Sequence, residues 1–242
     1  MEAYDAIAEE YRDSKQLPFR EHLERHTLFR LLGDVRGKTV LDMACGEGFY
    51  TRLLKRAGAS EVTGVDISGE MIRLARDQEA RHPLGCRYVR ADAAAFQPQV
   101  RVDLVVAMYL FNYAGNAGQL GRFCRACHDA LRPGGRLVGV NDNVRNVPPG
   151  TASLTKYGLE RSCPDPAAEG DVIRYTVTNA GGRPFRFDNF YLTPETYGST
   201  FQQAGFQGFR WVDLRLSPSQ RDNSFWDDFL SNPPIAAFTA TR

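Results

Sequence analysis

The chain has 242 residues, of which 43% are hydrophobic and 24% charged, a balance typical of a globular protein with a sizeable core. It carries 30 Lys and Arg against 29 Asp and Glu, and this near-neutral balance favours neither a nucleic acid nor an anionic membrane as its partner. The longest apolar run, residues 104–111, is shorter than a membrane span, and residues 1–11 lack the basic and apolar parts of a secretory signal. We therefore expect one cytoplasmic domain with a small-molecule partner; the oligomeric state is not readable from the sequence.

The five cysteines are an odd number in a chain too long to depend on a disulfide framework, so we expect them to be reduced. Cys124, Cys127 and His128 spell CxxCH, the attachment motif of a c-type haem. However, Leu120, Cys124, Cys127 and Leu131 recur at helical spacing. This spacing predicts that both cysteines lie on the buried face of a helix.

Short apolar segments and segments with helical spacing alternate over the first 141 residues. We expect helices over residues 18–35, 49–58 and 119–131 and from residue 68, and strands over residues 39–43, 61–66, 86–91, 103–109 and 136–141. The RPGG segment, residues 132–135, is typical of a turn. Because strands separated by helices pair in parallel, this order predicts a Rossmann-like, doubly wound α/β fold with a mostly parallel sheet.

The regular alternation of predicted strands and helices ends after residue 141. Residues 142–170 are rich in Pro, Asn, Ser and Gly, and residues 171–179 and 183–192 read as a β-hairpin. A helix from Thr193 to Gly205 and a last strand over residues 208–217 then complete the sheet. We therefore divide the single domain into an N-terminal flap (1–17), a cofactor-binding core (18–141), an inserted β-rich lid (142–192) and the end of the core sheet (193–242).

Three acids lie at the carboxyl ends of consecutive predicted strands: Asp42, Asp66 and Asp92. Ligands of open α/β sheets bind at these ends, so all three should face one crevice. Asp66 suits the two hydroxyls of a ribose, and Asp92 suits the exocyclic amine of adenine. Asp42 would repel the pyrophosphate of a dinucleotide but suits a cationic amino group. The acids therefore favour a nucleoside with an amino acid moiety over NAD.

Four motifs, DMACGEG, GVDIS followed by Met71, DAAAF and LRPGG, resemble the ordered motifs of class I methyltransferases, which use S-adenosylmethionine and release S-adenosylhomocysteine. By this resemblance the methionine end would be held by Asp42, Ala44 and Gly46, the ribose by Asp66 and Ile67, the adenine by Met71, Asp92 and Ala93, and the sulfonium would lie near Met108. The family usually has glycine where this chain has Ala44. That change costs little if the backbone there has a negative φ.

The segment YDAIAEEY places Tyr4 and Tyr11 on one side of a helix, if it is helical. It resembles the flap that closes over the cofactor in small-molecule methyltransferases. We assign Tyr11 to cofactor binding and Tyr4 to catalysis as a base or hydrogen-bond partner of the acceptor. The alternative is that both tyrosines only anchor a terminal helix.

The expected acceptor-facing residues are aromatic or amide side chains near the later strand ends and on the lid: Tyr109, Phe111, Asn112, Asn141, Tyr157 and Tyr191. This neutral set favours a flat heterocycle or a phenol. The runs YRDSKQLPFRE and RGKTVLDMACGEGFYTRLLKRAGASEVTGVDIS are similar to toxoflavin synthase type N-methyltransferases. That resemblance implies methylation of a ring nitrogen in an azaheterocyclic natural product, with no metal.

Three other hypotheses remain open. The first is an O-methyltransferase for a phenol or a carboxylate. The second is a protein that binds the cofactor without transferring methyl. The third, methylation of a nucleic acid base, predicts an NPPY-like run after the fourth strand, where this chain reads MYLFNYAG, so we do not expect a nucleic acid substrate.

Overall fold

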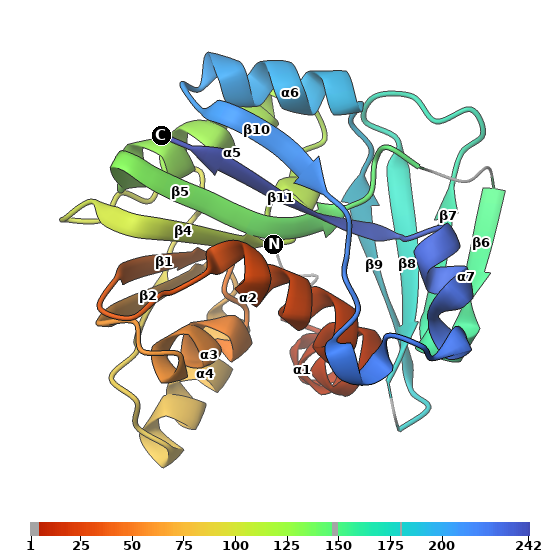
Figure 1. The fold of residues 1–242 in the computed structure, drawn as a ribbon, viewed down its shortest axis with the longest axis horizontal. Coiled ribbons are helices and arrows are strands. Elements are labelled where there is room, and N and C mark those ends of the chain that lie inside the picture. Colours follow the sequence, from red (N-terminus) through yellow and green to blue (C-terminus); the bar gives the residue numbers. More distant parts are fainter. Residues whose placement is uncertain (1–4, 147–149, 180) are drawn as a thin grey trace.

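The computed structural model describes residues 5–146, 150–179 and 181–242, whose centre is a seven-stranded sheet (Figure 1). The strand order is β10-β11-β5-β4-β1-β2-β3. The strands are β1 (Thr39–Met43), β2 (Glu61–Asp66), β3 (Arg87–Arg90), β4 (Val102–Met108), β5 (Leu131–Asp142), β10 (Gln207–Val212) and β11 (Ile235–Thr241). Strands β1 to β5 pair in parallel, whereas β11 is antiparallel to both of its neighbours, so the predicted mostly parallel sheet is confirmed.

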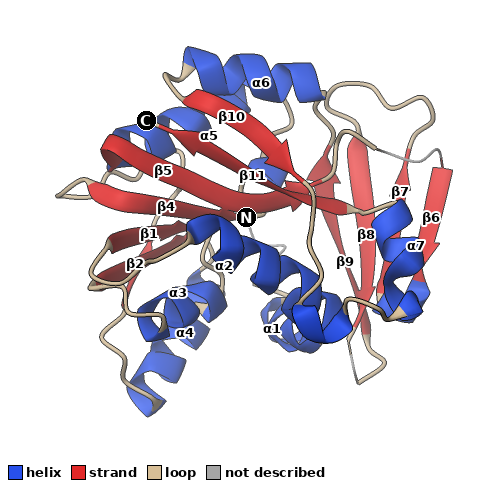
Figure 2. Cartoon of the chain, viewed as in Figure 1, coloured by secondary structure: helices blue, strands red, loops and turns tan. Residues whose placement is uncertain are grey.

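Helices cover both faces of this sheet (Figure 2). On one side lie α2 (His26–Leu32), α3 (Phe49–Arg56) and α4 (Gly69–Arg81), and on the other α5 (Ala117–Ala130) and α6 (Pro194–Gln203). The shorter helices are α1 (Ala8–Asp13) and α7 (Asp227–Ser231), and a π-helical segment, η2 (Arg20–Arg25), precedes α2. Among the described residues no helix is long and apolar enough to cross a membrane.

Two hydrophobic cores follow from the alternation of side chains along the strands. Val40 and Leu104 pack in the core that contains α2 and α3, whereas their neighbours Leu41 and Val105 pack in the core under α5 and α6. The second core includes Cys124 and Cys127, which confirms their predicted burial. All five cysteines are free thiols.

The predicted elements agree with the structure over most of the chain, including the bounds of β1 and β2. Ser68 caps α4 through a hydrogen bond from the backbone N–H of Met71 (3.1 Å), and Thr193 caps α6 in the same way. The helix expected over residues 18–35 is not a continuous α-helix, because the π-helical segment η2 leads into α2. The predicted RPGG turn instead lies within β5.

The prediction that residues 208–217 form the last strand is wrong. These residues contribute the edge strand β10, and the sheet is completed by β11, which lies between β5 and β10. The sequence of β11 is IAAFTAT, which is buried on both faces but rich in small side chains. It is buried because it lies between β5 and β10 inside the sheet, and no local sequence pattern predicts that position.

A second, four-stranded antiparallel sheet stands beside the carboxyl ends of β4 and β5 (Figure 1). Its strands are β6 (Gly150–Leu154), β7 (Leu159–Cys163), β8 (Val172–Thr178) and β9 (Pro184–Phe190). The β8–β9 hairpin confirms the predicted one, whereas β6 and β7 were not expected in a segment rich in turn residues. Apolar side chains of this small sheet, such as Ile173 and Tyr175, join the core that lies over α2 and α3.

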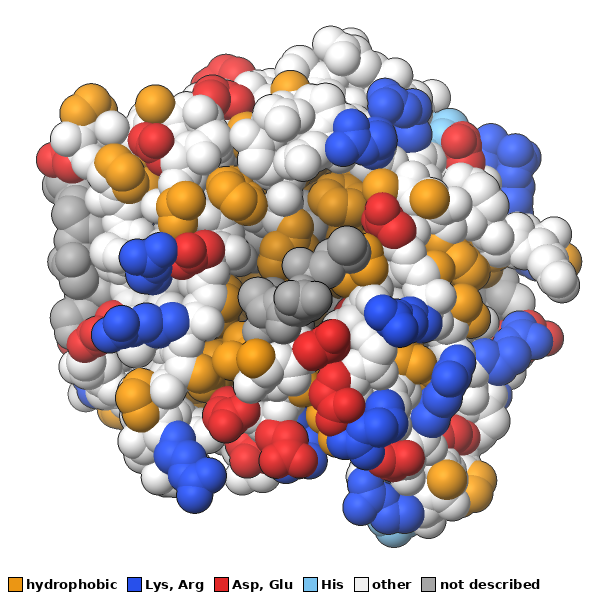
Figure 3. Space-filling model, turned by 180° about the vertical axis from the view of Figure 1, so that it is seen from behind, with side chains coloured by type: hydrophobic (Ala, Val, Ile, Leu, Met, Phe, Trp, Pro, Cys, Tyr) orange, Lys and Arg blue, Asp and Glu red, His pale blue; other side chains and the backbone are white. Residues whose placement is uncertain are grey.

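The outer surface carries charges of both signs. Figure 3 shows the face seen from behind, where Lys and Arg side chains are interspersed with Asp and Glu and hydrophobic side chains gather toward the middle. Ion pairs among the described surface residues include those of Arg73 with Glu70 and with Asp77. On this face the charges form no extended region of a single sign.

Gly139 in β5 tests how tightly the sheet is packed. A Cβ atom at this position would collide with the carbonyl oxygen of Ala107 and lie 2.5 Å from Cζ of Phe238. We therefore expect Gly139→Ala to lower the free energy of unfolding by about 1–3 kcal/mol or more, measured by urea denaturation. Gly198→Ala, in α6 where a Cβ meets nothing within 4 Å, should instead raise it by about 0.5–1 kcal/mol. Equal effects of the two changes would contradict the packing around β5.

Candidate functional site

Asp42 and Asp66 come together at the carboxyl ends of β1 and β2. Asp42 is fully buried; its Oδ2 accepts a hydrogen bond from Oγ1 of Thr51 (2.6 Å), and its Oδ1 has no partner among the described residues. Asp66 accepts hydrogen bonds from the backbone N–H groups of Gly46 (2.8 Å) and Ser68 (2.9 Å). Burial raises the pKa of Asp42 to about 7, against the hydrogen bond from Thr51, and burial also raises the pKa of Asp66. The site therefore holds a carboxylate oxygen that needs a partner.

The turn after β1 has the conformation of a glycine-rich loop. Ala44 has φ 60°, so the expectation that a negative φ makes alanine inexpensive here is wrong, and the backbone is strained at this residue. Gly46 and Gly48 also have positive φ, and a Cβ on Gly48 would lie 2.6 Å from the Tyr88 ring. The turn thus brings backbone close to Asp66 with little side-chain bulk.

The other predicted cofactor residues surround this turn. Met71 is buried on α4, with its sulfur 3.9 Å from the position that a Cβ of Gly46 would take. Ile67 is partly exposed, and Met108 is buried at the end of β4. Asp92 is exposed after β3, where its Oδ1 accepts from the N–H of Ala94 (2.8 Å) beside the buried Ala93.

The N-terminal segment is docked over the same edge of the sheet. Tyr4, the predicted catalytic residue, lies outside the described residues. The carboxylate of Asp5 accepts hydrogen bonds from the hydroxyl of Ser68 and from the N–H of Glu70 (3.2 Å). Tyr11, on α1, packs against the small core that contains Met71. This segment therefore contacts the predicted adenine side of the site.

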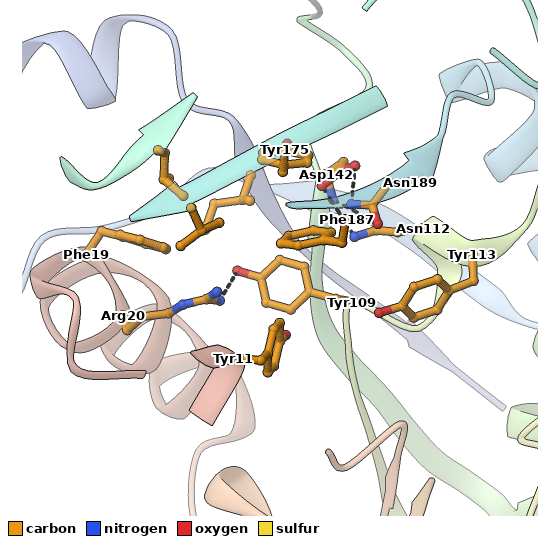
Figure 4. Close-up of a pocket in the computed structure, with 13 residues that line it drawn as sticks. Tyr11, Phe19, Arg20, Tyr109, Asn112, Tyr113, Asp142, Tyr175, Phe187 and Asn189 are labelled. Atoms are coloured by element: carbon orange, nitrogen blue, oxygen red, sulfur yellow. Dashed lines mark hydrogen bonds between the residues drawn. The ribbon is translucent and has the colours of Figure 1, made fainter. Parts of the chain in front are cut away.

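A pocket opens between the ends of β4 and β5 and the small sheet (Figure 4). Its aromatic lining residues are Tyr11, Phe19, Tyr109, Tyr113, Tyr175 and Phe187. Its polar lining residues are Arg20, Asn112, Asp142 and Asn189. The cavity measures about 20 Å³, about enough for one water molecule. A ring-sized ligand therefore enters only when lining side chains move.

At one end of this pocket a buried charge cluster centres on Glu24. Its carboxylate accepts hydrogen bonds from Arg20 Nη1 (2.6 Å) and from the hydroxyls of Tyr50 and Tyr109. Arg20 Nη1 also donates to the Tyr109 hydroxyl (2.9 Å). Although burial opposes ionisation, the Arg20 charge and the two tyrosine hydroxyls hold the pKa of Glu24 below its usual value. The cluster therefore stays ionised and fixes Tyr109, whose φ is 64°.

Asp142 occupies the other end of the pocket, as Figure 4 shows. Its carboxylate accepts hydrogen bonds from Asn189 Nδ2 (2.9 Å) and Asn112 Nδ2 (3.3 Å), and its backbone N–H donates to Asn112 Oδ1 (3.0 Å). Burial raises the pKa of Asp142 to about 6, against the hydrogen bond from Asn189 and the charge of Arg161. This end of the pocket thus combines a titratable carboxyl with two neutral amides.

Of the six predicted acceptor-facing residues, Tyr109 and Asn112 line the pocket. Phe111 is buried between Phe201 and Phe238, and Tyr157 is stacked on Trp226, so both are core residues. Asn141 is also buried and donates to the hydroxyl of Tyr197 (2.9 Å), because adjacent residues of β5 face opposite sides of the sheet. Tyr191 lies outside the lining of this pocket as well.

Sequence reasoning missed the pocket residues Arg20, Asp142 and Asn189, as well as Glu24. Arg20 and Glu24 have the i, i+4 spacing of a helical ion pair, but their burial could not be read from it. Asp142 is the residue immediately after the predicted fifth strand, so the rule that placed the other acids at strand ends also applies to it. For Asn189 the sequence holds no comparable signal.

Glu24→Ala should destabilise the protein strongly, because it leaves the buried Arg20 charge without its counter-ion. We expect a loss of about 3–5 kcal/mol in the free energy of unfolding, measured by urea denaturation. Glu21→Ala is the matched control, since Glu21 pairs with Arg25 at the exposed surface of the same segment; its loss should stay below about 1 kcal/mol. If Glu24→Ala lost no more stability than Glu21→Ala, the buried ion pair between Glu24 and Arg20 would be contradicted.

Comparison with known proteins agrees with this geometry. Residues 40–135 match a family described as a methyltransferase domain. The chain is 32% identical over 193 residues to a demethylmenaquinone methyltransferase of Tropheryma whipplei, covering 78% of this chain and 75% of that protein. It is 26% identical over 168 residues to the N-demethylindolmycin N-methyltransferase of Streptomyces griseus, covering 69% of this chain and 68% of that protein. Relatives named as O-methyltransferases also match, but the chain spans about half their length.

The solved structures show the same fold. The S-adenosylmethionine dependent methyltransferase of Mesorhizobium loti superimposes with a TM-score of 0.63 at 22% identity, covering 89% of this chain and 95% of that one. The parallel sheet, the small-residue turn after β1 and the acids at the ends of β1 and β2 are in the arrangement that the sequence motifs predict. This chain belongs to the class I family of S-adenosylmethionine-dependent methyltransferases.

Proposed function

We propose that the protein transfers the methyl group of S-adenosylmethionine to a ring nitrogen of a small azaheterocycle, a natural product of the toxoflavin type. When bound, the cofactor supplies an activated methyl group on a sulfonium. The protein then has to hold the two reactants in line and keep water away. The pocket between the two sheets, with flat aromatic walls and a polar end, is the observation that carries this proposal.

The residues at the ends of β1 and β2 suit this cofactor. Oδ1 of Asp42 is buried without a described partner, and an ammonium group is a complementary donor for it. The Asp66 carboxylate accepts hydrogen bonds from the backbone N–H groups of Gly46, Ser68 and Ile67 and keeps a lone pair for a ribose hydroxyl. We assign the remaining contacts as the motifs imply, to Tyr11, Ala44, Gly46, Ile67, Met71, Asp92, Ala93 and Met108.

The walls of the pocket favour a flat acceptor. Tyr175 and Phe187 stack with ring centroids 5.4 Å apart, and Tyr11 meets Phe187 edge to face at 6.2 Å. Such surfaces bind planar conjugated rings. A nucleic acid instead needs a basic groove, whereas the one cation among the described residues of this lining, Arg20, is paired with Glu24. We therefore propose a free small molecule as the acceptor.

O-methylation of a phenol or a carboxylate is the second candidate, because several relatives are named as O-methyltransferases. A phenol would use the same aromatic walls, but it offers a single polar group to a pocket end that holds one carboxyl and two amides. A protein that binds the cofactor without transferring methyl is the third. The three candidates differ in which acceptor, if any, receives the methyl group.

Purified protein incubated with methyl-labelled S-adenosylmethionine and a panel of azaheterocycles, phenols and small carboxylic acids should label a heterocycle at nitrogen and release one S-adenosylhomocysteine per methyl group. Label on oxygen of a phenol or an acid would support the second candidate instead. Tight cofactor binding with no labelled acceptor in the whole panel would contradict methyl transfer.

Asp42 should make cofactor binding depend on pH. An ammonium group pairs with the ionised carboxylate, and the pKa of Asp42 in the free protein is raised to about 7. Calorimetric affinity for S-adenosylhomocysteine should therefore be highest near pH 8, where the carboxylate is ionised and the ligand's amino group still largely protonated, and fall by up to about tenfold per pH unit below 7. Asp42→Asn should bind weakly without this dependence, and Glu61→Gln, at the opposite end of the sheet, should behave as wild type. The same pH dependence in Asp42→Asn would contradict the assignment.

A further inference from the structure

We propose that Asp142, flanked by Asn112 and Asn189, binds a ring N–H of the acceptor and takes its proton, so that the acceptor is a heterocycle with an N–H beside a carbonyl. This inference rests on the proposed function and names the substrate class and the proton acceptor within it. The three residues lie on separate elements: Asp142 ends β5, Asn189 is in β9 and Asn112 is in the short turn after β4.

The carboxylate of Asp142 keeps hydrogen-bonding capacity toward the pocket. Each of its oxygens accepts one amide hydrogen, Oδ1 from Asn112 and Oδ2 from Asn189, whereas a carboxylate oxygen has two lone pairs. The Tyr175 hydroxyl also hydrogen-bonds the Asp142 carboxyl. Asp142 is 2% exposed and lines the pocket, so a ligand in the pocket would meet the lone pair that the two amides and Tyr175 leave. Figure 4 shows the three side chains gathered at this end, away from Arg20.

No cation described in the structure neutralises Asp142 at contact distance. Arg161 lowers its pKa through charge alone, because the guanidinium donates to the carbonyl oxygens of Pro234 (3.2 Å) and Asn146 (3.0 Å). Arg20, across the pocket, is held by Glu24. Of the other titratable groups that face Asp142, Tyr175 is hydrogen-bonded to its carboxyl, and Tyr197 and Cys163 feel its charge. Asp142 is thus a buried carboxyl with neutral partners, which binds protons more readily than an exposed one.

The order of groups at this end defines the edge of the ligand. A carboxylate that accepts lies between two amide nitrogens that donate, and each amide carries a second hydrogen besides the one given to Asp142. The complementary edge is an N–H with a carbonyl beside it, as in a lactam or an imide ring. A phenol matches only the carboxylate, and a heterocycle without N–H gives the carboxylate no donor from the ligand.

The chemistry balances without a further reactant. Asp142 ends β5 two residues beyond Val140, which pairs with Met108, so it lies farther along the sheet than the end of β4. It takes the proton of the ring N–H, and the electron pair left on the ring is shared with a conjugated ring nitrogen. That nitrogen forms the new N–C bond as the C–S bond of the sulfonium breaks, and the pair of that bond stays on sulfur as a thioether. The positive charge of the cofactor and the negative charge of Asp142 cancel.

Binding of two probes in the complex with S-adenosylhomocysteine tests the N–H contact without turnover. Lumazine has two ring N–H groups beside carbonyls. In 1,3-dimethyllumazine both N–H groups are methylated and the carbonyls are kept. With saturating S-adenosylhomocysteine at pH 7, calorimetry should show lumazine binding at least about tenfold tighter than the dimethyl compound. At pH 5, with Asp142 protonated, lumazine should bind about tenfold more weakly than at pH 7. Equal binding of the two compounds, or binding of neither, overturns the proposal.

Asp142→Asn should abolish both the preference for lumazine and its pH dependence. Asp188→Asn is the matched control, because Asp188 precedes Asn189 on β9 but pairs with Arg174 at the surface. In label-transfer assays Asp142→Asn should lower kcat by at least about a hundredfold and remove the rise in rate through pH 6, with the control unchanged. A wild-type pH profile in Asp142→Asn overturns the proposal. Selective lumazine binding with no methyl transfer by wild type would instead refute only the proposed function.

Discussion

The carboxylate of Glu24 joins three parts of the chain that are far apart in sequence. It accepts hydrogen bonds from Arg20 in its own π-helical segment, from Tyr50 at the start of α3, and from Tyr109 just after β4. A charge this deeply buried persists only because every partner is in place. The arrangement holds Tyr109 in a left-handed conformation, and Tyr109 lines the pocket between the two sheets.

The carboxyl groups around the site differ in how completely they are paired. Glu24 is neutralised on contact by Arg20, whereas Asp42 and Asp142 are buried with neutral partners or with a free oxygen. The Glu24–Arg20 pair stabilises the fold without a ligand, because each charge is neutralised within the protein. The arrangement of Asp42 and Asp142 lowers the stability of the protein while the carboxyls are ionised, and that cost is recovered when a ligand supplies the missing charge or donor.

The sequence was sufficient for most of the core because its strands are apolar and its turns carry glycine, proline and capping residues. It was insufficient where burial depends on distant partners. Asn189, Tyr157 and Phe111 illustrate this: the first lines the pocket and the other two are core aromatics, although their local sequences suggest no such difference. Ala44 shows the same limit for the backbone, since its positive φ is imposed by the turn.

The position of β11 has a consequence for the order in which the chain assembles. Strand β10 pairs with β11, and β11 pairs in turn with β5, so β10 reaches the sheet only through a segment that the ribosome makes after it. Until residues 235–241 emerge, a nascent chain carries β5 as an open edge with unpaired N–H and C=O groups. The cofactor half, β1 to β4, has no such dependence. It can therefore form during synthesis, and the half that contains β5, β11 and β10 is completed afterwards.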